Sequence, residues 1–111
     1  MTVGETEAEA LKITGAAYKL WHDSLTKFWR ENHVKGPSFA RYMVDTVERV
    51  IAGGAHIARS PETVRDQLAE RVDKLGVNYM MIAFNIGNKA HDDAMRSITS
   101  GEEVMPKLAA L

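Results

Sequence analysis

The sequence contains no cysteine, which excludes disulfide bonds, thiolate metal sites and a cysteine nucleophile. It also lacks any run of about 20 apolar residues, the length that a membrane-spanning helix needs. Residues 1–10 carry three glutamates where a secretory signal would need positive charge followed by an apolar run. The 14 basic and 15 acidic residues are interleaved, so no basic patch indicates nucleic acid. We therefore expect a cytoplasmic protein with neither a membrane nor a nucleic-acid partner.

Two helices are predicted in the first half of the chain. From Thr6 to about Arg30 the larger apolar residues recur three, four or seven positions apart, which places them on one helical face. Thr6 followed by Glu9 has the spacing of a capping box. The same apolar spacing returns over residues 39–51, and Gly53-Gly54 is expected to end that second helix.

Two further helices are predicted in the second half. Ser60-Pro61-Glu62 combines an N-cap residue, a proline suited to the first helical position and a carboxylate near the positive end of the helix dipole. Gly76 is expected to stop this third helix. A fourth is predicted from about residue 91 to 106, with Gly101 interrupting it and Pro106 ending it.

The segment 77–86 is the strongest strand candidate. It is almost continuously apolar and bounded by Gly76 and Gly87, as is typical of a strand that is covered on both faces. Such a strand needs hydrogen-bonding neighbours. Residues 55–58 and the few residues before Glu5 have too little length and β-branched content to pair with it convincingly. We therefore expect its neighbours to come from another polypeptide region.

Three stretches resemble a known family in their order and spacing. Together with a looser match at residues 5–10, they extend the resemblance over nearly all of the chain. The stretches are Ser60-Pro61-Glu62-Thr63-Val64, Gly76-Val77-Asn78-Tyr79, and Gly87-Asn88 leading through His91 and Arg96-Ser97 to Glu103-Val104-Met105-Pro106. On these residues the chain resembles the luciferase-like flavin-dependent monooxygenases.

The resemblance implies the C-terminal part of a (β/α)8 TIM-type barrel. The fold class would be α/β by ancestry and mostly α in this chain, with one clear strand at about 77–86, about four helices, and residues 1–111 as a single truncated domain. Enzymes of this family use reduced FMN and O2, and some use a deazaflavin. Because a barrel active site is assembled from loops at the ends of many strands, most flavin contacts should lie upstream. We expect no catalytic residue and no turnover in this chain alone, which is a fragment, a truncated reading frame or a reduced descendant.

The chain departs from the family pattern at two places. Arg59 stands where the family usually has glycine before the third helix, and the last helix is one residue short near Ser100-Gly101. Deleting one residue rotates the rest of a helix by about 100°. Val104 and Met105 should then not face the same core as Ile98 without a local distortion.

Several residues are candidates for a site. Asn85 is the candidate for cofactor binding, because a polar side chain near the end of a buried strand must find a ligand, water or backbone partner. Tyr79, Met81 and Phe84 are interpreted as core residues, with contact to a flavin or substrate as the alternative. For the aromatic residues of the first helix, packing is favoured over a cofactor stack; these are Trp21, Phe28 and Trp29.

The four histidines do not indicate a metal site. No pair has helical ligand spacing together with a carboxylate, and His91-Asp92-Asp93 is interpreted as an acidic helix start. The other histidines are His22, His33 and His56. An alternative hypothesis is a noncatalytic helical protein that forms a homo-oligomer or docks on a partner, such as the remainder of a barrel, because its apolar faces need cover.

Overall fold

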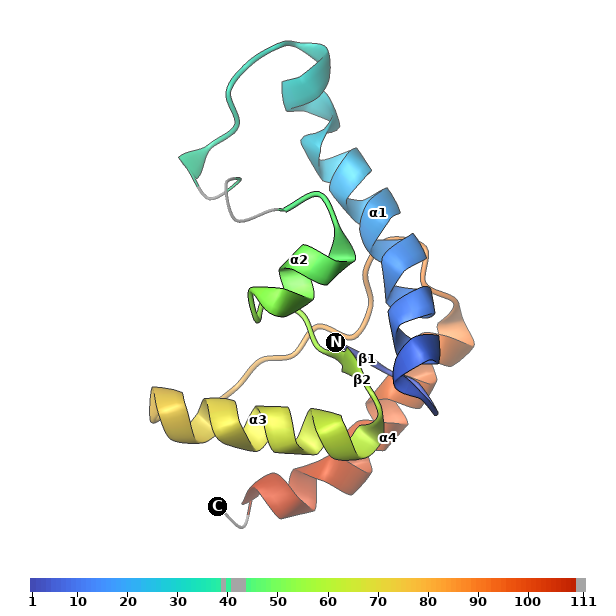
Figure 1. Cartoon of the computed structure of the whole chain (residues 1–111), viewed down its shortest axis with the longest axis vertical. Coiled ribbons are helices and arrows are strands. Elements are labelled where there is room, and N and C mark those ends of the chain that lie inside the picture. The colour runs from blue at the N-terminus through green and yellow to red at the C-terminus, as the bar shows by residue number, and fades with distance from the viewer. Residues whose placement is uncertain (39, 41–43, 110–111) are drawn as a thin grey trace.

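The computed structural model describes residues 1–38, 40 and 44–109. Its elements follow the order β1 (Thr2–Val3), α1 (Glu7–Glu31), α2 (Val47–Ala52), β2 (Ala58–Arg59), α3 (Pro61–Leu75) and α4 (His91–Ala109). Figure 1 shows the short strands at the centre, with α1 along one side and α3 and α4 below them. The described chain is therefore mostly helical, with four helices, as the apolar periodicity predicts.

The sheet consists of two parallel strands. Thr2 pairs with Ala58 and Val3 with Arg59. The N–H of Thr2 donates to the Ile57 carbonyl, whereas the N–H of Val3 points to the opposite edge and donates to Ser97 Oγ at 3.1 Å. Both strands overlap the two weak strand candidates of the sequence, which pair with each other. Helix α4 covers the edge of β1 that faces away from β2, and its Ser97 accepts the hydrogen bond from the Val3 N–H there.

The prediction of a strand at 77–86 is wrong for the described chain. This segment is extended but belongs to neither strand of the sheet. Its side chains alternate: Met80, Ile82 and Phe84 are partly buried against the core, while Tyr79 and Met81 are 80% and 86% exposed. A strand requires a neighbouring ladder, and among the described residues no N–H of this segment donates to a backbone carbonyl. The segment is thus half-covered rather than buried on both faces.

Helix α1 begins as predicted. Thr6 is the N-cap and its Oγ1 accepts from the Glu9 N–H at 3.2 Å, while Glu9 Oε2 accepts from the Glu5 N–H at 2.8 Å. The predicted apolar face is only partly used, because Tyr18 is buried whereas Phe28 is exposed. The contact with the sheet is made instead by small buried residues that allow close approach: Ala10, Thr14 and Ala17.

Helix α2 is shorter than predicted. It begins at Val47 after the N-cap Thr46, so residues 44–46 of the predicted helix are not helical. The first apolar positions of that prediction, residues 39 and 43, lie outside the described residues. Thr46 Oγ1 accepts from the Arg49 N–H at 3.4 Å, a local cap that competes with further helix toward the N-terminus. Gly54, with φ at +77°, follows the helix end as predicted.

Helix α3 has the predicted ends. Ser60 occupies the N-cap position with Pro61 at the first helical position, and Gly76 closes the helix with φ at +60°. The Ser60 hydroxyl makes no bond to a helix amide and lies 3.2 Å from Thr63 Oγ1 instead. The helix buries Val64 and Leu68.

Helix α4 is continuous, so the predicted interruption at Gly101 and the predicted end at Pro106 are wrong. A Cβ at Gly101 would make only an ordinary van der Waals contact with the Phe84 ring, at 3.7 Å, so packing does not require the glycine. Val104 is buried and Ile98 is exposed without any distortion of the helix. Met105, seven residues after Ile98, shares its exposed side.

Two clusters of apolar residues form the core. The larger one joins β1, the start of β2, α3 and α4 through Met1, Val3, Ile57, Val64, Leu68 and Val104. The smaller one joins α1 and α2 through Tyr18, Val47 and Val50. The segment 77–86 spans both, since Met80, Ile82 and Phe84 contact the first cluster and Ile86 the second.

Candidate functional site

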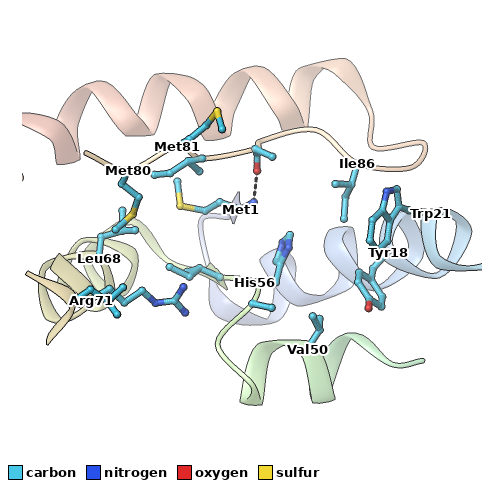
Figure 2. Close-up of a pocket in the computed structure, with 15 residues that line it drawn as sticks. Met1, Tyr18, Trp21, Val50, His56, Leu68, Arg71, Met80, Met81 and Ile86 are labelled. Atoms are coloured by element: carbon cyan, nitrogen blue, oxygen red, sulfur yellow. Dashed lines mark hydrogen bonds between the residues drawn. The ribbon is translucent and has the colours of Figure 1, made fainter. Parts of the chain in front are cut away.

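A cavity of about 550 Å³ lies between the two clusters, and we name it the His56 cavity. Figure 2 shows its walls: α1 and α2 on one side, α3 on the other, and segment 77–86 above. Its lining is mainly apolar and comprises Met1, Tyr18, Trp21, Val50, Ala55, His56, Ile57, Leu68, Arg71, Leu75, Met80, Met81, Ile82, Ala83 and Ile86. The cavity lies at the N-terminal ends of β1 and β2, because Met1 precedes one strand and residues 55–57 precede the other.

Arg71 and His56 supply the polar side chains of this cavity that lack partners. Figure 2 shows Arg71 extending from α3 toward His56. Among the described residues Arg71 forms neither a hydrogen bond nor an ion pair, and His56 Nε2 is buried without a partner. Tyr18, by contrast, donates its hydroxyl to the Val44 carbonyl at 2.6 Å, and burial raises its pKa. The cavity therefore offers one cationic group, and His56 forms part of its wall with Nε2 covered by protein.

Two amino groups lie close to the cavity wall, those of Lys89 and of Met1. Lys89 is only 8% exposed, and its Nζ donates to the Phe84 carbonyl at 2.6 Å, to Thr2 Oγ1 at 2.8 Å and to the Met1 carbonyl at 3.1 Å. Burial lowers the pKa of Lys89. The Met1 ammonium donates to the Ala83 carbonyl, and burial, assisted by Lys89, lowers its pKa to about 5. These bonds hold segment 77–86 against β1.

His56 makes the stability of the fold sensitive to acid. Burial and the nearby Met1 ammonium and Lys89 lower its pKa from 6.5 to about 3. Between these values the unfolded chain binds a proton that the folded chain does not, so this contribution to stability is complete above pH 6.5 and is lost as pH falls toward 3. We expect wild type to lose up to about 2 kcal/mol relative to H56Q between pH 7 and pH 5.

Urea unfolding at pH 7.5, 6.0 and 5.0 measures this difference. The Met1 ammonium adds a loss of its own as pH falls from 8 toward 5, and this part should persist in H56Q. The variant H33Q, which changes an exposed histidine, is the matched control and should follow wild type. Parallel pH curves for wild type and H56Q would contradict the assignment of a neutral, buried imidazole.

The structure places the candidate site residues of the sequence in different surroundings. Asn85 is exposed, so the expectation that it lies near the end of a buried strand and needs a partner is wrong. Tyr79 and Met81 are exposed rather than core residues, although Met81 borders the His56 cavity. Phe84 is partly buried as predicted, and Trp21 lines the cavity whereas Trp29 and Phe28 do not.

The residues that matter most at the cavity carry little sequence signal. The sequence pattern of α3 places Arg71 on a polar side of the helix. Lys89 follows a turn and belongs to no motif. In the part of the chain that the structure describes, no cluster of three His, Cys, Asp or Glu residues could hold a metal ion. Within the same part, no helix has both the length and the apolar character needed to cross a membrane.

Comparison with known proteins adds no family to this description. No family model, no curated protein and no solved structure matches the chain.

Proposed function

We propose that the chain is the C-terminal segment of a luciferase-like βα barrel, from an oxidoreductase of the flavin-dependent monooxygenase type that uses reduced FMN and O2. The observation that carries the proposal is the parallel pairing of β1 and β2 across the helical connection through α1. Strand, helix, parallel strand and helix in succession is the repeating unit of a βα barrel. The extended segment 77–86 and α4 follow in the order of one further unit.

The C-terminal ends of β1 and β2 are where a βα barrel places its chemistry. Glu7 Oε1 lies 3.9 Å from Arg59 Nε and accepts from Thr63 Oγ1 at 3.3 Å. Glu9 accepts from Arg96 at 2.9 Å. In the part of the chain that the structure describes, each of these two carboxylates pairs with an arginine. The proposal therefore assigns the flavin contacts to upstream parts of the barrel.

Arg59 has a specific part in this arrangement. It occupies the position where the resembled family usually has glycine, and its guanidinium reaches across the strand ends toward Glu7. A long paired side chain at that position fills space at the face that a barrel active site would use. This supports a segment that does not turn over substrate by itself.

Size-exclusion chromatography with light scattering and flavin absorbance tests the proposal. We expect the 111-residue chain to elute without FMN, and a chain extended by upstream barrel strands encoded in the same frame to coelute with it. Absence of coding sequence for such strands, together with a stable, flavin-free assembly of the 111-residue chain, would contradict the proposal.

A second candidate function is self-association without catalysis, and the amount of exposed surface favours it. The chain exposes 7498 Å², whereas a compact monomer of its mass exposes about 6,100 Å². Its radius of gyration is 15.1 Å, compared with about 13 Å for a compact chain of this length. The excess of about 1,400 Å² is larger than the roughly 800 Å² that each partner buries in a standard interface.

The exposed face of segment 77–86 is where we place this association. Tyr79 and Met81 project from an extended backbone whose N–H groups donate to no backbone carbonyl of the described residues, so a second copy can add both apolar contact and backbone pairing. The variant M81D should weaken self-association at least tenfold, because the carboxylate would be desolvated, while monomer stability stays unchanged. Sedimentation equilibrium over a range of concentrations measures the effect.

The matched control is F28D, which places the same charge on an exposed apolar residue of α1. It should associate as wild type does. Equal dissociation constants for wild type and M81D would remove segment 77–86 from the interface, and an equal loss in F28D would show a general effect of charge.

A further inference from the structure

We propose that the His56 cavity binds a small aromatic carboxylate. Its volume of about 550 Å³ lies within the range of about 300 to 1,000 Å³ that is typical of small-molecule sites. Such sites combine apolar walls with a few polar groups that orient the ligand. The His56 cavity has this composition, with Arg71 as its orienting group.

Charge selects an anion for this cavity. Arg71 points toward His56 without a partner among the described residues, and none of the lining residues is Asp or Glu. Lys89, whose Nζ donates to the Met1 carbonyl, adds positive potential from the same side. A guanidinium binds a carboxylate through two parallel hydrogen bonds, and these are stronger in an apolar surrounding than in water. The carboxylate of the ligand is therefore placed on Arg71.

The walls select an aromatic body. The Tyr18 and Trp21 rings lie 5.6 Å apart with an interplanar angle of 42°, and they close one end of the cavity. Methionine side chains, which adapt their shape and contact aromatic rings favourably, line the other walls at Met1 and Met80. A planar ring system can thus contact both kinds of surface.

A second hollow, the α4 groove, does not compete for this ligand. It measures about 660 Å³ and lies between α3, α4 and segment 77–86. Among the side chains that the structure describes, its lining is apolar apart from Ser100 and Glu102. Glu102 would repel a carboxylate, so the anion is assigned to the His56 cavity.

The ligand site is independent of the proposed flavin chemistry. The His56 cavity lies at the N-terminal ends of β1 and β2, whereas a barrel enzyme places its chemistry at the C-terminal ends. A failure to bind FMN therefore has no bearing on this site, and binding of a carboxylate here says nothing of monooxygenase activity.

Titration with 2-naphthoate tests the proposal, with the neutral 2-naphthamide as comparator. A W29F background leaves Trp21 as the sole tryptophan, so a change in its fluorescence reports on the cavity. We expect 2-naphthoate to bind about tenfold more tightly than 2-naphthamide. R71Q should abolish this preference and leave 2-naphthamide binding unchanged.

R65Q is the matched control, because Arg65 lies on the same helix but pairs with Asp66 and does not line the cavity. It should retain the tenfold preference. If R71Q loses its helical circular dichroism, R71K replaces it, and the preference should fall to a few fold because lysine lacks the planar fork. Equal binding of the two probes, no saturable binding, or an equal loss in R65Q would overturn the proposal.

Discussion

G87A is expected to destabilise the fold by at least about 3 kcal/mol. Gly87 has φ at +56°, a conformation that costs a non-glycine residue about 1 kcal/mol or more. A Cβ added there would lie 2.1 Å from the Ala17 carbonyl oxygen. The oxygen belongs to backbone and the position of a Cβ is fixed by its own backbone, so no rotamer change can relieve the clash, and α1 or the turn after segment 77–86 must move. Urea unfolding measures the loss.

G76A is the matched control for this prediction. Gly76 has nearly the same backbone conformation, with φ at +60°, but an added Cβ would meet nothing within 4 Å. Only the conformational cost should remain, about 1 kcal/mol. If the two variants lose equal stability, then the approach of Gly87 to Ala17 does not hold segment 77–86 in place.

L68A is expected to cost about 2 to 5 kcal/mol, the range for removing a buried leucine side chain. Leu68 is 3% exposed and belongs to the larger core cluster. It also lines both the His56 cavity and the α4 groove, so its side chain separates the two hollows. Because the two hollows already lie on either side of Leu68, few neighbouring atoms can move in to fill the space that the truncation leaves.

L75A, one heptad later on α3, provides the comparison. Leu75 is 68% exposed, and its truncation should change the free energy of unfolding by no more than about 0.5 kcal/mol. Thermal and urea unfolding of both variants should rank L68A far below L75A. Similar values for the two would contradict the placement of Leu68 between the hollows.

Helix ends were predictable where local chemistry decides them. The Thr6 cap, Pro61 at the first turn of α3 and the left-handed Gly76 depend on groups within a few residues, and all three have the expected geometry. Gly101 and Pro106 carry equally strong local signals, yet α4 continues through both. Burial of Val104 outweighs the intrinsic helix propensity there.

The candidate site was much less predictable. Asn85 was selected because an apolar run suggests burial on both faces, but burial requires a covering element and none covers that side in the described residues. Arg71 and Lys89 have no motif, since their significance comes from segments far apart in sequence. Lys89 is buried because Met1, Thr2 and Phe84 converge on its Nζ.

The sequence by itself determined the number of helices, most of their ends and the extended conformation of residues 77–86, because these follow from apolar periodicity and from contacts within a few residues. Only the tertiary structure decided which strands pair, which face of segment 77–86 is covered and where a cavity with unpaired polar groups forms. The physical reason is that hydrogen-bond ladders, desolvation and steric closure depend on groups distant in sequence, and their geometry is absent from any local pattern.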